Sequence, residues 1–469
     1  MTGASESAAA PRRGARRVLS AVLFFPRGGS AHTARGLAQE LPDHGWQVRL
    51  VAGSRPDLGP DADAAAFYSG IDVYPVRLSE SIDEVEPAGE HGPSAPMHPS
   101  YEDRPGAADR VFASLDDRQF ELQVKCWRRA LDAGGAGRAD LLHLHHLTPL
   151  NDAAIRTQPQ VPVVGQLHGT ELLMLEQIAD GPPPSWRYAE RWAERIRGWA
   201  NSAHRLVVAP GGLQRAAQLL ELPESKLVAL PNGFRPDKFR PFPVDRGEHW
   251  RRNLVEEPQG ALPGGPPGSV SYRDADLAPL REGVILTCIG RFTEVKRVPL
   301  LIRAFADAQE RFEQPAALVL IGGYPGEHEG EHPAEVAAAE RARNVFLAGW
   351  HSHHALPAFL NASDAIVLAS VREQFGQVLV EAMACGLPAI AVESFGPRGI
   401  VEDGRTGWLV PGDDRRALAA AMVECVNNDD ERQRRGKLAR ESALRQFSWS
   451  GIAARLAACF EEVVQEDAQ

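Results

Sequence analysis

The chain has 469 residues, of which 43% are hydrophobic and 24% charged, and its formal net charge is −11. This length and apolar content suffice for two substantial hydrophobic cores, so we expect two domains. The negative charge disfavours nucleic acid as a partner, because a phosphate backbone would be repelled. The cysteines are scattered without any pairing or metal-ligand spacing, which predicts a reducing, cytoplasmic location.

The N-terminal segment imitates a secretory signal, since an arginine-rich stretch at 12–17 precedes a short apolar core at 18–25. That core runs into a proline–glycine turn without an A-x-A-like cleavage site, so we interpret residues 17–25 as the first strand of the fold. The arginines could touch an anionic membrane, although we do not favour this interpretation. No apolar run approaches the length of a transmembrane helix.

Gly28 and Gly29 form a turn between this strand and a predicted helix at 31–41. A strand, a glycine turn and a helix make a common anion-binding unit, because the first helical turn offers free N–H groups. The full G-x-G-x-x-G fingerprint is absent, so the turn is also compatible with a plain connection. The same absence disfavours a nicotinamide-dependent dehydrogenase.

Strand-like and helix-like segments alternate along the chain, which predicts parallel α/β sheets. Two stretches rich in proline and glycine interrupt the alternation, and we interpret the first as an insertion and the second as an interdomain linker. The expected organisation is an N-terminal domain at 1–240 with the insertion at 54–106, a linker at 241–283, a C-terminal domain at 284–446 and a final helix at 447–469.

Four histidines gather where two predicted strands end: His143, His145 and His146 after one, and His168 after the other. They could in principle assemble a metal site. No H-E-x-x-H motif or paired cysteines accompany them, and alternate strand positions point to opposite faces of a sheet. We therefore expect no bound metal.

The segment 371–409 carries the strongest functional signal. An apolar strand at 365–369 is followed by Glu373 in a loop and by a helical pattern at 375–384 that contains Glu381. Carboxylates before a helix and two turns into it can accept hydrogen bonds from different hydroxyls of one ligand. Two glutamates at this spacing also arise by chance in acidic proteins, so the surrounding residues must decide.

The surrounding residues favour a ligand site. Phe375 and Gly376 open the helix, and the glycine lets a ligand approach the backbone closely. Upstream, a predicted strand at 285–289 ends in Gly290 and Arg291, and Lys296 follows before the next helix. Lysine is rare in this arginine-rich chain, so a lysine at this position indicates a compact point charge.

Together these motifs resemble retaining glycosyltransferases of family 4, also called glycosyl transferases group 1, whose hallmark is a glutamate, seven residues and a second glutamate. The resemblance implies the GT-B fold, an α/β architecture of two Rossmann-like doubly wound parallel-sheet domains facing a cleft. It further implies transfer of a sugar from a nucleoside-diphosphate sugar to an acceptor with retained anomeric configuration, and no cofactor or metal.

The resemblance also assigns roles to individual residues. Arg291 and Lys296 would hold the donor diphosphate, because fixed cations stabilise the charge that develops as the glycosidic bond breaks. Glu373 would hold the donor sugar, Glu381 the ribose, and His168 would face the transferred sugar. The implied catalytic set is His168, Arg291, Lys296 and Glu373, and the implied donor-binding set is Gly28, Gly29, Gly290, Arg291, Lys296, Glu373, Phe375, Gly376 and Glu381.

Several alternatives remain open at this point. One alternative is a sugar-nucleotide epimerase, which could have the same two-domain fold and would need no acceptor. Another is a non-catalytic protein that binds a nucleotide-sugar without transferring the sugar. We expect a small, soluble acceptor that offers a hydroxyl or a thiol, as in family members that make thiol sugars or glycosylated natural products. Membrane-bound lipids are the alternative acceptors. Tyr101 and Asp103 are candidates for acceptor contact.

Overall fold

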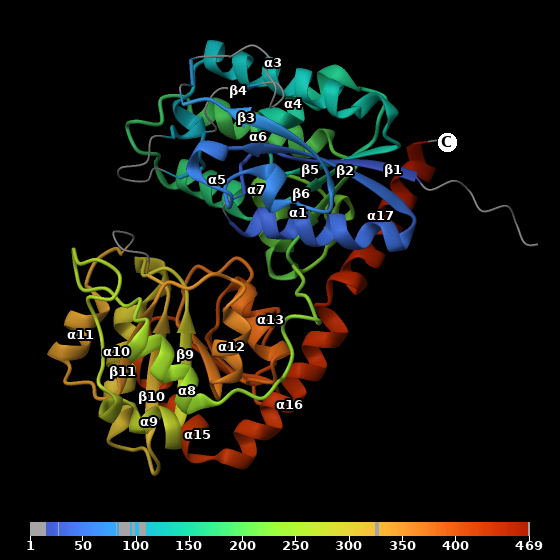
Figure 1. Ribbon diagram of the computed structural model, residues 1–469. Helices are drawn as coiled ribbons and strands as arrows, with labels where there is room; N and C mark the ends of the chain where they lie inside the picture. Colours follow the sequence, from blue (N-terminus) through green and yellow to red (C-terminus); the bar gives the residue numbers. More distant parts are fainter. Residues whose placement is uncertain are drawn as a thin grey trace, which may run out of the picture. The chain divides into compact units, whose positions relative to one another are not determined.

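The computed structural model describes residues 16–26, 28–80, 82–83, 94–95, 99–102, 109–323 and 328–467 (Figure 1). Asp103 lies outside these residues. The chain divides into two compact units, of which unit 1 comprises Met1–Val207, Leu219–Lys226 and Ala453–Gln469, and unit 2 comprises Val208–Gln218 and Leu227–Ile452. No helix in the described part of the chain is both long and apolar enough to cross a membrane.

The first sheet has the strand order β4-β3-β2-β1-β5-β6-β7-β8. Its strands are β1 (Arg16–Val22), β2 (Trp46–Ser54), β3 (Asp72–Leu78), β4 (Ser94–Ala95), β5 (Leu141–His145), β6 (Val163–Gln166), β7 (Arg205–Val208) and β8 (Leu227–Ala229). The helices of this half are α1 (Gly29–Glu40), α2 (Ala64–Phe67), α3 (Asp117–Gly134), α4 (Pro149–Thr157), α5 (Thr170–Asp180), α6 (Ala189–Ser202) and α7 (Leu213–Leu220). The central pairs β1–β2, β1–β5 and β5–β6 are all parallel.

The second sheet has the order β11-β10-β9-β12-β13-β14. Its strands are β9 (Val284–Ile289), β10 (Ala316–Ile321), β11 (Val345–Gly349), β12 (Ala365–Leu368), β13 (Ala389–Val392) and β14 (Gly407–Val410). The helices that belong with this sheet are α8 (Arg246–Arg251), α9 (Ala278–Glu282), α10 (Val298–Gln309), α11 (Pro333–Ala339), α12 (Leu356–Asn361), α13 (Gln377–Ala384), α14 (Phe395–Arg398), α15 (Arg415–Asn427) and α16 (Asp429–Gln446), and α17 (Trp449–Asp467) ends the chain.

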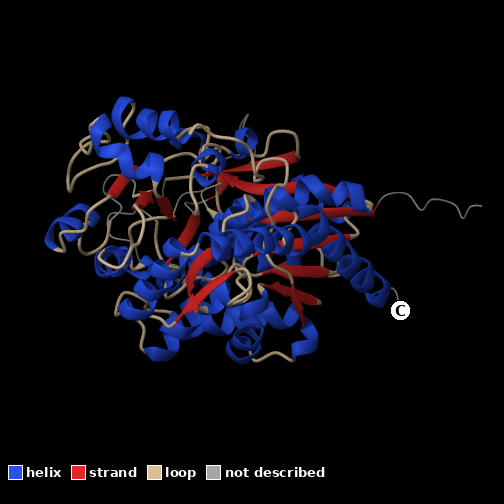
Figure 2. Cartoon of the chain, turned by 90° about the horizontal axis from the view of Figure 1, so that it is seen from below, coloured by secondary structure: helices blue, strands red, loops and turns tan. Residues whose placement is uncertain are grey.

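Alternate residues of the strands in the second sheet enter two separate cores. On β9, Leu286 joins the core that includes Leu301 of α10 and Met422 of α15, whereas Ile285 joins the core that includes Leu379 of α13. Strands buried on both faces need continuous apolar runs, which explains why this sequence gives a parallel sheet covered by helices (Figure 2). The predicted parallel α/β architecture is confirmed.

Both predicted interruptions contain ordered structure. Within residues 54–106, β3 pairs in parallel with β2, so part of this stretch belongs to the sheet. Residues 241–283 lie inside unit 2, where Trp250, Leu254 and Leu280 are buried in its core. These few large apolar side chains order a segment whose average composition is that of a linker.

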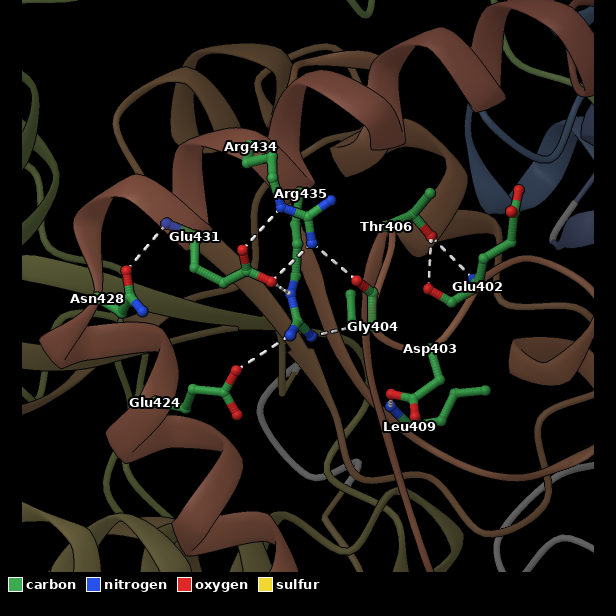
Figure 3. Close-up of polar contacts among 11 residues, drawn as sticks. Glu402, Asp403, Gly404, Thr406, Leu409, Glu424, Asn428, Glu431, Arg434 and Arg435 are labelled. Atoms are coloured by element: carbon green, nitrogen blue, oxygen red, sulfur yellow. Dashed lines mark hydrogen bonds and ion pairs between the residues drawn. The ribbon is translucent and has the colours of Figure 1, made fainter.

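Arg435 joins α16 to the edge strand β14, and Arg434 joins it to the turn before that strand through the Gly404 carbonyl at 2.8 Å (Figure 3). Arg435 Nη1 donates to the carbonyl of Gly407 at 2.7 Å, its guanidinium lies 3.9 Å from the centre of the Trp408 ring, and it is paired with Glu431 at 2.7 Å. Arg434 is also paired with Glu431, at 2.7 Å. The Gly407 carbonyl, which also accepts from the Gly404 N–H at 3.1 Å, is thus fully paired at the edge of the sheet.

The final helix, α17, is assigned to both units, with Ala453 onward in unit 1. There Phe460 packs edge-on against Trp46, with ring centroids 5.2 Å apart, and against His143 at 5.3 Å. Arg16 of β1 is paired with Glu461 at 3.0 Å. The apolar face predicted for this helix therefore packs on the first sheet.

Candidate functional site

The loops after β9 and β12 carry the motifs of unit 2. The two strands pair in parallel, with Ile366 opposite Thr287, so their carboxyl ends lie at the same edge of the sheet. Ligands of open parallel sheets bind at this edge. The fold therefore brings together two motifs that are far apart in the sequence.

Lys296 and Glu373 meet at this edge. Lys296 Nζ donates to Oε2 of Glu373 at 2.5 Å, and the two side chains are 23% and 17% exposed. The two loops are also joined through Val295, whose carbonyl accepts from the backbone of Val371 at 3.0 Å and from the hydroxyl of Ser370 at 3.2 Å. The ammonium and the carboxylate are therefore held side by side and remain partly accessible.

Arg291 is exposed and makes no ion pair with any residue in the described part of the chain. Its neighbour Gly290 is anchored, because its N–H donates to the carbonyl of Ile321 at 2.9 Å. At the end of β10, a Cβ on Gly322 would lie 2.0 Å from the Gly290 carbonyl oxygen. The glycine-arginine turn is thus fixed by the close approach of two strand ends, while the guanidinium remains exposed.

The loop that carries Glu373 ends at a helix opened by glycine. Gly376 has φ 100°, a left-handed conformation that suits glycine, and its carbonyl accepts from Leu379 at 2.9 Å in the first turn of α13. The helix thus begins at Gln377, slightly later than predicted, and Phe375 is buried just before it. The first turn of α13 leaves backbone N–H groups near Glu373.

A second glycine supports the same loop from α14. Gly396 N–H donates to the carbonyl of Glu373 at 2.9 Å, and a Cβ at this position would lie 2.1 Å from the carbonyl oxygen of Phe375. Only glycine permits this close packing of backbone on backbone. Gly396 therefore positions the loop, a role that the sequence pattern alone did not reveal.

Glu381 is buried on α13, with 3% of its surface exposed. Its Oε1 accepts from His353 Nε2 at 2.7 Å and from Gln377 Nε2 at 3.2 Å. The neighbouring Cys385 shows the effect of this environment, since burial and then the Glu381 charge raise the pKa of its thiol to about 12. Sequence reasoning missed His353, although the three histidines at positions 351, 353 and 354 were a visible signal.

In unit 1, the two glycines of the first turn border open space. Gly28 precedes α1 in an extended conformation, and a Cβ on Gly28 or Gly29 would meet no atom within 4 Å. The described backbone around them therefore does not itself require glycine. The carbonyl of Gly28 accepts from Ala31 at 3.1 Å, which starts the helix.

His168 follows β6 and lies among the other histidines of unit 1. Its Nε2 is 3.0 Å from Nδ1 of His145, and its ring centroid is 4.4 Å from that of His146. Burial, followed by the charges of neighbouring histidines, lowers the pKa of His168 well below its ordinary value. The imidazole is therefore neutral near pH 7.

Glu171 holds this arrangement from α5. Its fully buried carboxylate accepts from His146 Nδ1 at 2.8 Å and from the backbone N–H of His168 at 3.4 Å. Tyr101, a candidate for acceptor contact, is buried, and its hydroxyl donates to the carbonyl of Leu147 at 2.8 Å. Within the described residues, no group of histidine, cysteine and carboxylate side chains has the geometry of a metal site.

The architecture resembles solved glycosyltransferase structures. Sucrose-phosphate synthase from Thermosynechococcus elongatus matches with a TM-score of 0.64 at 18% identity, covering 96% of this chain and 100% of that one. The Anabaena protein Alr3699/HepE in complex with UDP and glucose matches with a TM-score of 0.67 at 16% identity, covering 95% and 100%. At these identities the likeness establishes the fold, which is GT-B.

Sequence comparison identifies the family. Residues 27–238 match the model described as Glycosyltransferase Family 4, and residues 274–442 match the model described as Glycosyl transferases group 1. D-inositol 3-phosphate glycosyltransferase from Corynebacterium jeikeium is 29% identical over 69% of this chain and 72% of its own length. Phosphatidyl-myo-inositol mannosyltransferase from Mycobacterium leprae is 26% identical over 93% and 94%.

The chain belongs to glycosyltransferase family 4. It is a glycosyltransferase that uses a nucleotide-sugar donor, as the resemblance implied. The predicted fold class and enzyme class are confirmed, and neither the family models nor these relatives support the epimerase alternative.

Proposed function

We propose that the protein transfers a hexosyl group from a nucleoside-diphosphate sugar to a small acceptor, with retention of anomeric configuration and without a bound metal or cofactor. The observation that carries the proposal is the contact between Lys296 and Glu373 at 2.5 Å, beside the first turn of α13. A cation, a carboxylate and free helical N–H groups are the partners that a phosphorylated sugar requires.

Lys296 and Arg291 are proposed to hold the diphosphate. Lys296 is already oriented by Glu373, and Arg291 is exposed at the preceding turn. As the bond between C1 and the diphosphate oxygen breaks, negative charge accumulates on the leaving group. Cations fixed in advance lower the barrier because they need no reorganisation at that moment.

Glu373 is proposed to bind sugar hydroxyls and not to attack C1. Its carboxylate is occupied by the Lys296 ammonium, which lowers its nucleophilicity. Retention then follows from same-face substitution. The acceptor oxygen bonds to C1 as the diphosphate oxygen leaves from the same face, and the diphosphate takes the acceptor's proton.

The remaining roles are assigned by the same proposal. Glu381, held by His353, would bind the ribose through its carboxylate, and Phe375 and Gly376 would offer backbone N–H groups. His168 would contact the transferred sugar. Gly28, with open space beside it, would lie near the phosphates or the acceptor.

The names of relatives support a small hydroxylated acceptor. Besides the inositol 3-phosphate enzyme, N-acetyl-alpha-D-glucosaminyl L-malate synthase from Bacillus anthracis is 30% identical over 39% of this chain and 46% of its own length. Each name refers to a small anion that carries a hydroxyl group, inositol 3-phosphate in one and L-malate in the other. The Mycobacterium leprae relative is named for a phosphatidyl-linked inositol, so a lipid acceptor is the competing case.

Thermal-shift measurements with UDP-, GDP- and ADP-sugars test the proposal, followed by product analysis with the best donor. A bound donor raises the melting temperature by mass action. We expect one donor class to stabilise the protein, a soluble hydroxylated anion to act as acceptor, and proton NMR to show the donor's anomeric configuration in the product. Product formed with phosphatidylinositol alone, or with an inverted anomeric centre, would contradict it.

A further inference from the structure

Four polar side chains form a continuous row through the first sheet, which we call the histidine row: Ser20, His143, His145 and His168. Ser20 on β1 lies opposite His143 on β5 in the parallel register. Its hydroxyl is 3.4 Å from Nδ1 of His143 and 3.3 Å from Nε2 of His145. The remaining ring nitrogen of His145, Nδ1, is 3.0 Å from Nε2 of His168.

The imidazoles of the histidine row are neutral near pH 7. Burial lowers the pKa of His143 to about 4 and lowers the pKa values of His145 and His168 well below their ordinary range, with the neighbouring histidines adding to the effect for the latter two. Each ring therefore carries a single N–H. Each nitrogen contact must then pair one donor with one acceptor.

This condition leaves the histidine row two possible directions, because the single proton of the Ser20 hydroxyl has no acceptor among the described residues other than these two ring nitrogens. If Ser20 donates to His143, His145 must donate to Ser20 and accept from His168, which leaves Nδ1 of His168 as an acceptor. If Ser20 donates to His145, then His145 Nδ1 donates to His168 Nε2, and His168 carries its proton on Nδ1. The tautomer of His168 is thus coupled, through His145, to the orientation of the Ser20 hydroxyl.

Burial of His143 distinguishes the two directions. Its Nε2 is buried and has no hydrogen-bond partner among the described residues. The nearby Gln166 side chain opposes the lowering of the His143 pKa, but no hydrogen bond of normal geometry joins it to this nitrogen. In the first direction Nε2 would be an unpaired buried N–H, whereas in the second it is an unpaired lone pair. Unpaired buried N–H groups are the rarer case in proteins.

We propose that Ser20 and His145 are positioning residues that hold His168 in the tautomer protonated on Nδ1. Nδ1 of His168 is then a hydrogen-bond donor, suited to a sugar oxygen. The functional part of this inference rests on the proposed contact between His168 and the transferred sugar, whereas the tautomer itself does not.

Among the described residues, Glu171 contacts the backbone of His168, and the His146 ring lies against the His168 ring. The Glu171 carboxylate accepts from His146 Nδ1 and from the backbone N–H of His168, and the Tyr101 ring lies tilted against His146 with a centroid distance of 5.8 Å. These contacts fix the backbone and the neighbouring ring. The contact to the His168 ring nitrogen that selects its tautomer comes from His145.

Long-range proton–nitrogen NMR of protein labelled with 15N-histidine tests the proposal, because the two ring nitrogens report the tautomer directly. Signals of His168 are assigned with His168→Gln. We expect the Nδ1-protonated tautomer in the unaltered protein and a mixture of tautomers in Ser20→Ala. Ser54→Ala, which removes another buried hydroxyl of unit 1, is the matched control and should leave the His168 signals unchanged. A His168 protonated on Nε2, or unchanged signals in Ser20→Ala, would overturn the proposal.

Kinetics test the functional part separately. His145→Asn places an amide near the Nδ1 position and should retain most activity, whereas His145→Phe should lower kcat about tenfold or more with little change in the donor KM. Equal losses in the Asn and Phe variants would reject positioning by the ring nitrogen. If His168→Ala retains full activity while the NMR result stands, the role proposed for His168 fails and the tautomer assignment survives.

Discussion

Replacing Lys296 by alanine removes the cation on which the donor site depends. The substitution leaves the Glu373 carboxylate without a partner in a partly buried position, because the two side chains are 23% and 17% exposed. Opposite charges about 4 Å apart interact by about 4 kcal/mol at an effective dielectric constant of about 20. Exposed pairs contribute about 0.2–1 kcal/mol and breaking a buried pair costs about 3–5 kcal/mol. We therefore expect Lys296→Ala to lower the free energy of unfolding by about 1–2 kcal/mol.

The effect on catalysis should be larger than the effect on stability. Loss of one fixed group that stabilises developing charge typically costs about 10²–10³-fold in kcat, so we expect at least a 100-fold loss in Lys296→Ala. The assay combines urea unfolding with steady-state transfer kinetics. Lys437→Ala, at an exposed position of α16, is the matched lysine control and should change neither quantity. Transfer by Lys296→Ala at more than a tenth of the unaltered rate would refute the reasoning.

Three further predictions concern the loop, the ribose site and the edge strand. Gly396→Ala should displace the Glu373 loop and reduce activity about tenfold or more, because its Cβ would lie 2.1 Å from the Phe375 carbonyl oxygen. In the control Gly198→Ala of α6, the new Cβ would meet no atom within 4 Å, so the free energy of unfolding should be unchanged or higher. Transfer kinetics and thermal melts of both variants check this. Glu381→Gln should raise the donor KM more than it lowers kcat, which initial-rate kinetics over a range of donor concentrations would reveal, and an unchanged KM would argue against ribose contact. Pairing with Arg434 and then Arg435 lowers the pKa of Glu431 to about 2. Its contribution to stability is therefore present above its ordinary pKa of about 4.5 and is lost as pH falls towards 2. In acid unfolding, the free energy of unfolding of Glu431→Gln should fall less between pH 4.5 and 2 than that of the unaltered protein.

The sequence was sufficient to predict the architecture and the proximity of the two motifs. Apolar runs such as residues 284–289 can be satisfied only by burial on both faces, which leads to a parallel sheet between helices. Once the sheet is parallel, the loops after β9 and β12 must meet at one edge. The direct contact between Lys296 and Glu373 depends further on the pairing of β9 with β12, and it was not predicted from the sequence.

Other features depend on tertiary contacts that carry no local pattern. Trp250 and Leu254 are too few to stand out in a stretch rich in proline and glycine, yet their burial places residues 241–283 in the core of unit 2. His353 reaches Glu381 from a different loop, and Ser20 meets His143 only through the register of β1 on β5. Such contacts depend on strand order and side-chain direction, which residue composition does not encode.

The central claim is that Arg291 and Lys296 of unit 2 bind the diphosphate of the donor. Calorimetric titration with a nucleoside diphosphate and with the matching nucleoside tests this claim most directly. UDP and uridine are the first pair, with the guanosine and adenosine pairs following if neither binds. The account predicts that the unaltered protein binds the diphosphate much more tightly than the nucleoside, and that Arg291→Ala combined with Lys296→Ala removes most of this difference without weakening nucleoside binding. An undiminished preference for the diphosphate in that double variant would contradict it.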